Sequence, residues 1–231
     1  MRLSLVIPVY NEASTLAKVV NKALAVDFGW EVEIVIVDDG STDGTPNVIR
    51  HLMETHSQII GVFHQENQGK GAALRSGFKR ASGQVVIVQD ADLEYDPQEI
   101  PKIVNLIFDD IADVVYGSRF ITAGPHRVLY FWHYVGNRFL TSLSNIFTGL
   151  NLTDMEVCYK AFRKEVLDSI ELKEKRFGFE PEVTAKIAHK RWRIYEVPIS
   201  YYGRTYEEGK KINWKDGLRA LWCILKYNIW G

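Results

Sequence analysis

Cysteine is scarce in this chain, and the two that occur, Cys158 and Cys223, form no metal-ligand spacing. A small domain that depends on disulfides would need many more, so we expect two ordinary thiols in a reducing compartment. Hydrophobic residues make up 46% of the 231 residues and charged residues 25%. This composition excludes disordered and collagen-like chains and indicates a globular protein with its own core.

The sequence also lacks a long hydrophobic run. Residues 1–10 are apolar over too short a stretch for a signal peptide, and no small-residue cleavage site follows. Residues 128–150 are rich in aromatic side chains but contain His133, Asn137 and Arg138, and residues 214–230 carry four charged side chains. A helix that spans a membrane, about 20 residues long, is far less polar, so we expect none.

An excess of charge of one sign is missing as well, because the net charge is -1. The whole chain is therefore not expected to bind nucleic acid. The balance is uneven, since residues 186–231 contain ten Lys and Arg against four acids. This excess predicts either a local anionic partner or a solvated basic face, and charge alone does not decide between them.

Short Val- and Ile-rich runs alternate with helical patterns in the first half of the chain. We expect strands at residues 3–9, 32–37, 59–63, 85–88 and 113–116, and helices at residues 14–25, 45–56, 69–81 and 97–108. Strands that read as continuous apolar runs are buried on both faces. The pattern therefore predicts an α/β fold with a mostly parallel central sheet and helices on both faces.

The second half has a different pattern. We expect a long aromatic-rich helix within residues 121–150, strands at 155–162 and 193–199, helices at 164–170 and 181–190, and a polar loop at 202–211. A last helical stripe is formed by Leu218, Leu221, Trp222, Leu225 and Ile229. This stripe either packs onto the domain or lies at a membrane interface.

Acidic side chains follow the ends of several expected strands, where ligands bind in a sheet of this kind. Asp38 and Asp39 follow the second strand, and Asp90 and Asp92 follow the fourth. A lone Asp-X-Asp is commonly a turn or a helix cap. Carboxylates that share one crevice, however, repel each other unless a cation lies among them, and a hard divalent ion prefers oxygen ligands. The sequence therefore predicts a Mg²⁺ or Mn²⁺ site that also holds a diphosphate.

Glycine-rich phosphate cradles are absent. The turn at Gly69-Lys70-Gly71 lacks the spacing of a P-loop, and the turn after the first strand lacks the Gly-X-Gly-X-X-Gly fingerprint. We therefore expect a metal ion rather than a glycine cradle to hold the phosphates.

Four segments in this order resemble family 2 inverting glycosyltransferases of the GT-A fold. They are residues 6–12 (VIPVYNE), 37–45 (VDDGSTDGT), 67–71 (NQGKG) and 90–94 (DADLE). Within that family the chain looks most like the dolichol- or polyprenyl-phosphate mannose synthase group. That narrower resemblance rests on residues 117–120 (GSRF), 136–139 (GNRF), 202–204 (YGR) and 209–211 (GKK).

The resemblance implies a GT-A domain, a Rossmann-like nucleotide-diphospho-sugar transferase fold, at residues 1–211, and an amphipathic, interfacial helix at residues 212–231. It implies that the nucleotide-sugar is bound by Pro8, Tyr10, Glu12, Asp38, Asp39, Lys70, Asp90, Ala91, Asp92 and Arg204. The metal ligands would be Asp90, Asp92 and Glu94, although many relatives have Gln at the position of Glu94. The acceptor phosphate would be held by Arg119, Arg138 and Arg204, with Arg127 as a competing candidate. Asp92, Asp154 and Arg119 would be the catalytic residues.

The implied activity is transfer of one sugar from a UDP- or GDP-sugar to a polyprenyl phosphate. The enzyme would be peripheral at the cytoplasmic membrane face, in contact with the membrane or with a separate membrane partner. A phosphate acceptor is already largely dianionic near neutral pH and needs no strong base. Residues 152–160 depart from the family pattern but keep Asp154, which would orient the acceptor or act as base.

Two other functions remain open. The acceptor could be a saccharide hydroxyl, which would need Asp154 or Glu180 as a base. Acids such as Glu180 and Glu182 at a helix start are, however, also favoured by the helix dipole alone. A nucleotide-sugar-binding protein without turnover is the second alternative. A nucleotidyltransferase would need an Arg-rich glycine loop after the first strand, which is absent.

Overall fold

The computed structural model of the chain describes residues 1–121, 127–128, 130–205, 207 and 214–230. Within them a single seven-stranded sheet runs in the order β3-β2-β1-β4-β6-β5-β7. The strands are β1 (Arg2–Val9), β2 (Glu31–Asp38), β3 (Ile59–Phe63), β4 (Val85–Val88), β5 (Val114–Ser118), β6 (Lys160–Arg163) and β7 (Ile194–Pro198). All neighbours pair in parallel except β6, which is antiparallel to β4 and to β5.

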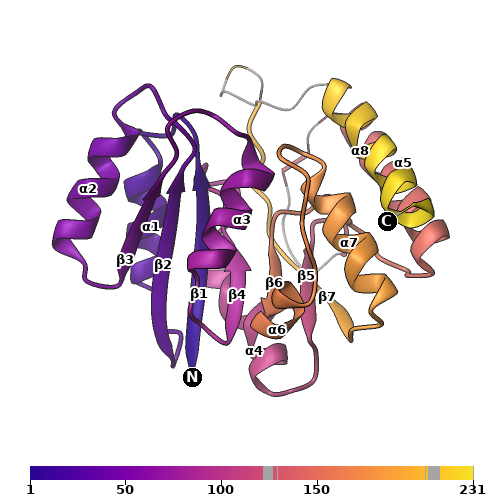
Figure 1. Ribbon diagram of the computed structural model, residues 1–231, viewed down its shortest axis with the longest axis horizontal. Helices are drawn as coiled ribbons and strands as arrows, with labels where there is room; N and C mark the ends of the chain where they lie inside the picture. Colours follow the sequence, from indigo (N-terminus) through magenta and orange to yellow (C-terminus); the bar gives the residue numbers. More distant parts are fainter. Residues whose placement is uncertain (122–126, 129, 206, 208–213, 231) are drawn as a thin grey trace.

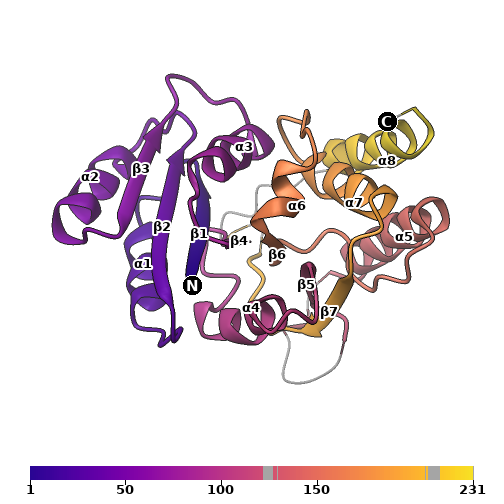
Figure 2. The same ribbon diagram turned by 60° about the horizontal axis from the view of Figure 1, so that its bottom comes forward.

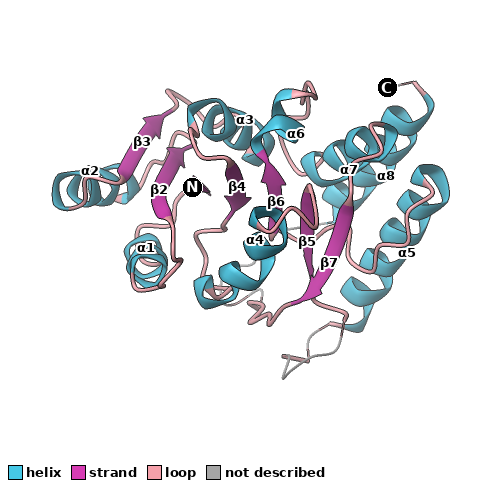
Figure 3. Ribbon diagram, turned by 90° about the horizontal axis from the view of Figure 1, so that it is seen from below, coloured by secondary structure: helices cyan, strands magenta, loops and turns pink. Residues whose placement is uncertain are grey.

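The helices cover both faces of this sheet (Figure 1). They are α1 (Leu16–Leu24), α2 (Thr45–Thr55), α3 (Lys70–Arg80), the 3₁₀ turn η1 (Pro97–Glu99), α4 (Ile100–Phe108), α5 (Phe131–Thr148), α6 (Lys164–Asp168), α7 (Phe179–His189) and α8 (Trp214–Ile229). From below, α1 and α4 lie on one side of the sheet and α3, α6 and α7 on the other (Figure 3). The expected α/β architecture, mostly parallel with helices on both faces, is confirmed.

The core lies between these layers and is built from the apolar runs of the central strands. Leu5 of β1, Ile36 of β2 and Val86 of β4 have no exposed surface. Burial of each such side chain stabilises the fold by roughly 1.5–3 kcal/mol relative to an exposed position. Strands that are buried on both faces cannot alternate polar and apolar residues, which explains their near-continuous Val and Ile sequences.

The strand expected at residues 155–162 is shorter than its pattern suggests, because β6 begins only at Lys160. The buried ammonium group of Lys160 donates hydrogen bonds to the carbonyls of Met155 and Val157. These bonds turn the preceding residues back on themselves and keep them out of the sheet. The four apolar residues among 155–159 are therefore buried in a loop beside the strand and not in the sheet.

The last helix, α8, packs beside α7 and α5 (Figure 2). Its buried face is formed by Ala220, Cys223, Ile224 and Tyr227. The stripe that the sequence suggested is not the docking face, because Leu218, Trp222 and Ile229 are each at least half exposed. Of the two placements that the sequence left open, packing of these three side chains onto the domain is therefore wrong, because other residues of α8 occupy the packed face. In the described part of the chain, no helix combines the length and apolar character needed to cross a membrane.

Candidate active site

A cavity of about 1540 Å³ lies at the carboxyl ends of the strands. It collects most of the residues that the sequence nominated: Pro8, Tyr10, Glu12, Asp39, Lys70, Asp90, Ala91, Asp92, Glu94, Arg119, Arg138 and Arg204. Asp38 and Asp154 are the two nominated residues that lie behind its wall. The Gly209–Lys211 motif lies outside the described residues.

Asp38 and Asp39 shape the loops that follow β2 and β3. Asp38 is buried and accepts a hydrogen bond from the backbone N–H of Ser41 at 3.2 Å. Asp39 accepts the N–H groups of Gln68 and Gly69 at 3.0 and 2.7 Å. The buried carboxylates thus hold the loops on which the nucleotide side of the cavity is built.

The ring of His64, which no sequence motif singled out, completes this arrangement. Its Nδ1 lies 2.7 Å from Oδ1 of Asp39, and its Nε2 lies 2.8 Å from the hydroxyl of Ser76 on α3. The sequence does not predict that His64 links Asp39 to Ser76, because a single His near the end of a strand occurs in many structural settings.

Steric constraints explain why glycine stands on both sides of Lys70. Gly69 has a φ of +97°, and a Cβ there would lie 2.3 Å from the carbonyl oxygen of Lys175. A Cβ on Gly71 would lie 2.5 Å from the carbonyl oxygen of Glu174. The Gly-Lys-Gly turn therefore admits a neighbouring backbone segment and places Lys70 at the first residue of α3.

Three acidic side chains follow β4, and each has a cationic partner. Asp90 lies 3.1 Å from Nζ of Lys70, and Asp92 lies 2.9 Å from Nη2 of Arg204. Glu94 lies 3.3 Å from Nε of Arg204. Burial, together with the negative charges of Asp90 and Glu94, raises the pKa of Asp92 to about 7. The two cations therefore leave the negative charge at this edge incompletely neutralised.

The expected metal ligands are not gathered around one point. Among the described residues no group of three or more His, Cys, Asp or Glu side chains has the arrangement of a metal site. Glu94 accepts instead from the Tyr201 hydroxyl at 2.8 Å and from the backbone N–H of Arg204. Leu93, between Asp92 and Glu94, has a φ of +65°. This conformation is strained for leucine, and it turns the chain between the two acids.

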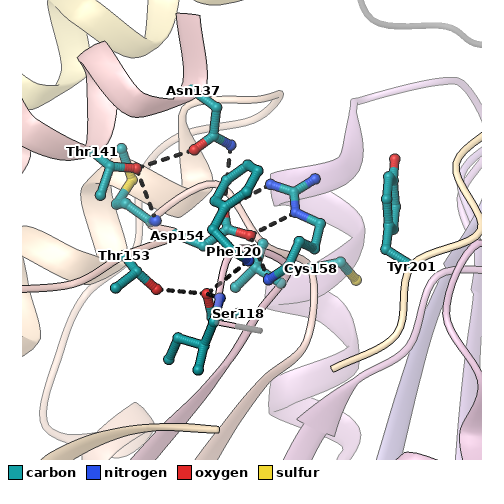
Figure 4. Close-up of polar contacts among 12 residues, drawn as sticks. Ser118, Phe120, Asn137, Thr141, Thr153, Asp154, Cys158 and Tyr201 are labelled. Atoms are coloured by element: carbon teal, nitrogen blue, oxygen red, sulfur yellow. Dashed lines mark hydrogen bonds and ion pairs between the residues drawn. The ribbon is translucent and has the colours of Figure 1, made fainter. Parts of the chain in front are cut away.

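Arg119 and Asp154 form the second charged centre. Asp154 is fully buried and accepts both Nε and Nη2 of Arg119, and the Asn137 amide donates to the same carboxylate (Figure 4). The Arg119 guanidinium also lies 5.1 Å from the centre of the Tyr201 ring and 5.6 Å from that of Phe120. This surrounding fixes the guanidinium at the wall of the cavity.

Other arginines of the site lie nearer its mouth. Arg138 on α5 is exposed, with Nη1 3.5 Å from the carbonyl oxygen of Thr153. Arg127 donates to the carbonyl of Gly203 at 2.9 Å and lines the same cavity. Arg127 and Arg138 thus both remain candidates for contact with an anionic ligand.

Several lining residues were absent from the expected site, and Tyr95, Glu156 and Tyr201 are the most informative. Tyr201 stands next to the Tyr-Gly-Arg motif, which was a usable signal. Glu156 stands in the segment that departs from the family pattern, so the resemblance carried no information about it. Glu180 was considered only as an alternative base, yet it lines the cavity too.

Solved structures with this fold include glucosyl-3-phosphoglycerate synthase from Mycobacterium tuberculosis. That similarity has a TM-score of 0.77 at 19% identity and covers 99% of this chain and 78% of that chain. A second similar structure, TarS from S. aureus, has a TM-score of 0.63 at 18% identity and covers 98% of this chain and 66% of that chain. At these identities the comparison shows a shared fold.

Two similar curated proteins are named undecaprenyl-phosphate 4-deoxy-4-formamido-L-arabinose transferase. The one from Aeromonas hydrophila is 29% identical and the one from Edwardsiella ictaluri 30% identical, each over 211 residues and 90% of this chain. The chain spans 62% of the length of these relatives. The model of the family described as "Glycosyl transferase family 2" matches residues 4–171. The chain therefore belongs to glycosyl transferase family 2.

Proposed function

We propose that the chain transfers a single sugar, with inversion, from a UDP- or GDP-sugar to a polyprenyl phosphate. The observation that carries this proposal is the composition of the cavity, which is lined by Asp90 and Asp92, by Arg119 and Arg204, and by aromatic side chains from the first turns of α5. An acidic edge suits a metal-bound diphosphate, arginines suit a second phosphate, and aromatic side chains suit an apolar tail. The names of the two longer relatives support the same acceptor class.

The residues after β4 fit a divalent cation. Asp90 and Asp92 offer carboxylate oxygens, which Mg²⁺ and Mn²⁺ prefer, and the raised pKa of Asp92 reflects a negative charge that a dication would relieve. A bound cation would neutralise the charge that develops on the leaving diphosphate. Structures of glucosyl-3-phosphoglycerate synthase are described as complexes with UDP and Mn²⁺ or Mg²⁺, and that protein shares this fold.

In the proposed reaction an oxygen of the acceptor phosphate attacks the anomeric carbon of the sugar. One carbon–oxygen bond forms to the acceptor, the bond to the nucleoside diphosphate breaks, and the electron pair leaves with the diphosphate. The acceptor, with a second pKa of about 6, brings its own nucleophilic oxygen and needs no base. Arg119 and Arg204 orient it, and Asp154 holds the guanidinium of Arg119 in place.

The nucleotide side of the cavity would be formed by Pro8, Tyr10, Glu12 and Lys70 at the ends of β1 and the start of α3. Asp38 and Asp39 would not contact the nucleotide through their carboxylates but would position the loops that bind it, because these carboxylates accept backbone N–H groups of the loops. In this proposal residues 1–211 carry both substrate sites, and residues 212–231 form the accessory helix.

A polyprenyl acceptor lies in a membrane, so the proposal includes peripheral contact at the cytoplasmic face. Phe131 and Trp132 at the start of α5 are more than 60% exposed and line the cavity. Leu218 and Trp222 leave an apolar stripe on the outer face of α8. Aromatic side chains beside Lys and Arg suit a membrane interface.

The test is a transfer assay with Mg²⁺ or Mn²⁺ that crosses UDP- and GDP-sugars with a short polyprenyl phosphate and, separately, with simple saccharides. We expect a metal-dependent lipid product. Product on a saccharide hydroxyl alone would favour the alternative acceptor and make Glu180 the base to test, because one of its carboxylate oxygens has no partner among the described residues. Nucleotide-sugar binding without any product would indicate a binding protein.

A further inference from the structure

Two carboxylates that the proposed reaction does not use, those of Glu156 and Glu180, line the same cavity. Glu156 lies two residues after Asp154 in the loop before β6, and Glu180 lies in the first turn of α7. Oε1 of Glu156 and Oε2 of Glu180 are buried, and neither has a hydrogen-bond partner among the described residues. Glu180 is only 4% exposed. A buried acceptor atom without a donor is costly, so these oxygens indicate a missing ligand group.

The neighbouring acid Glu182 shows that this is not a general property of the start of α7. Its two oxygens accept the backbone N–H groups of Lys173 and Glu174, both at 2.7 Å, and Nζ of Lys186 lies 2.7 Å away. Glu182 is therefore fully used by the fold. Helix-dipole stabilisation accounts equally for both acids and does not explain why only Glu180 retains an unused oxygen.

Both carboxylates sit on rigid supports. Lys160 fastens the loop of Glu156 through the carbonyls of Met155 and Val157, and its ammonium lies 4.6 Å from the centre of the Tyr116 ring. The hydroxyl of Thr184 donates to the carbonyl of Glu180 at 2.7 Å. Groups that are held in this way are suited to select among ligands by geometry.

Lys70 connects Glu180 to the diphosphate edge of the cavity. Its Nζ lies 3.1 Å from Asp90 and 3.4 Å from Oε1 of Glu180. A sugar attached to a diphosphate near Asp90 would therefore lie within reach of Glu180. The negative charge of Glu180, added to burial, raises the pKa of Glu156 to about 8, which indicates that the two carboxylates are close enough to repel each other.

We propose that Glu156 and Glu180 accept hydrogen bonds from hydroxyl groups of the transferred sugar, and that they restrict the donor to neutral, hydroxyl-rich sugars. A sugar carboxylate would bring a negative charge against the buried Glu180 carboxylate and could not donate to either orphaned oxygen, so it would be rejected. A hydroxyl group would supply the donor that each orphaned oxygen lacks. This inference rests on the proposed function, because it names the sugar class that the donor site takes.

The experiment compares the wild-type chain with Glu156→Gln and Glu180→Gln. Titration calorimetry with Mg²⁺ measures binding of UDP, UDP-glucose and UDP-glucuronate, and of GDP and GDP-mannose. We expect wild type to bind a neutral sugar donor at least about tenfold more tightly than the carboxylate donor. Each Gln variant should bind the neutral donor about 10- to 100-fold more weakly, while UDP and GDP affinities change less than about twofold.

Deoxyfluoro analogues of the preferred donor sharpen the comparison. Suppose that Glu180 binds one particular hydroxyl of the sugar. A donor in which fluorine replaces that hydroxyl should then bind wild type more weakly than the parent donor does, whereas Glu180→Gln should bind the two donors equally. Glu180→Asp keeps the negative charge but moves the carboxylate oxygen away from the sugar. It should therefore weaken binding of the neutral donor, as Glu180→Gln does. Glu182→Gln is the matched control on the same helical turn and should lower the melting temperature without changing sugar selectivity.

Unchanged selectivity among the sugars in both Gln variants would overturn this inference while leaving the proposed function standing. Wild type that binds UDP-glucuronate as well as UDP-glucose would overturn it too. A chain that binds neither UDP nor GDP with Mg²⁺ or Mn²⁺ would refute the proposed function, and the sugar pocket with it.

Discussion

The guanidinium of Arg119 and the carboxylate of Asp154 form a bidentate ion pair, with 2.6 Å between Nε and Oδ2 and 2.7 Å between Nη2 and Oδ1. The backbone N–H of Arg119 adds a third bond at 3.1 Å, and the Asn137 amide a fourth at 3.2 Å. Both carboxylate oxygens are therefore committed to donors. This geometry favours Asp154 as the residue that positions Arg119 over Asp154 as a base.

Replacing this carboxylate should test the two roles directly. Asp154→Asn leaves a buried guanidinium without its counter-charge, and we expect a loss of about 3–5 kcal/mol in the free energy of unfolding. The KM for the acceptor phosphate should rise, while the shape of the pH–rate profile stays the same. Denaturant titration and steady-state kinetics measure these effects. Loss of the acidic limb of the profile, with KM unchanged, would instead identify Asp154 as a base.

The cation at the β4 edge can be tested at Asp92. Asp92→Ala removes a proposed metal ligand, so metal-dependent transfer should fall by about 100-fold or more, with an unchanged circular dichroism spectrum. Glu94→Gln is the control, because its side-chain oxygen can still accept from the Tyr201 hydroxyl or the Arg204 backbone N–H, and it should preserve the metal dependence. Near-normal turnover of Asp92→Ala with added metal would refute the assignment.

Arg204 contacts the same carboxylates that would hold the cation, and its removal should have two opposite effects. Arg204→Ala should raise the KM for donor or acceptor by about 10- to 100-fold, because a charge-assisted phosphate contact is lost. Without nucleotide, Mn²⁺ should bind the variant at least as tightly as wild type, since Asp92 loses its competing cation. Exposed Arg138 offers a comparison, and Arg138→Ala should have the smaller effect on KM. Unchanged kinetics for both substrates would remove Arg204 from the site.

Glu174 attaches α8 to the body of the protein and should make stability depend on acid. It accepts hydrogen bonds from Arg219 at 2.6 Å, from the Tyr227 hydroxyl at 2.8 Å and from Lys226 at 3.2 Å. Burial opposes ionisation of Glu174, but these bonds outweigh it and lower its pKa to about 2, from an ordinary value of 4.5.

Between these two values the unfolded chain binds the extra proton, so the contribution of Glu174 to stability is complete above about pH 4.5 and is lost as the pH falls through about 2. Urea titrations across this range should show a shallower pH dependence for Glu174→Gln than for wild type. Glu171→Gln, at an exposed acid nearby, should keep the wild-type slope. Equal slopes for wild type and Glu174→Gln would contradict the assignment.

The sequence was most informative where local pattern and chain order agree. The apolar runs of the sequence show where each buried strand ends. Because parallel strands have their carboxyl ends at the same edge of the sheet, this is enough to place Asp39 and Asp90 at one edge. It was least informative about partners that arrive from distant segments. That Glu182 is bound by backbone N–H groups while Glu180 keeps an unused oxygen depends on how residues 173–174 pack against α7, and no spacing encodes it.

The placement of β6 was out of reach for a related reason. In the sequence β5 is the next strand after β4, yet in the sheet β6 lies between them and runs in the opposite direction. Alternation of strands and helices cannot reveal such an insertion. The direction in which the α8 stripe faces was likewise left open by the sequence, because Leu218 and Trp222 give the same helical pattern whether they point to the core or outward.

The insertion of β6 has a consequence for biosynthesis. While the ribosome makes the chain, β4 has a neighbour in β1 but presents an unpaired hydrophobic edge until Lys160–Arg163 have emerged. Exposed strand edges of this kind recruit other chains. The first half, although it contains the whole acidic edge, therefore cannot close its sheet alone, and nascent chains that stall between residues 118 and 160 should depend most on chaperones.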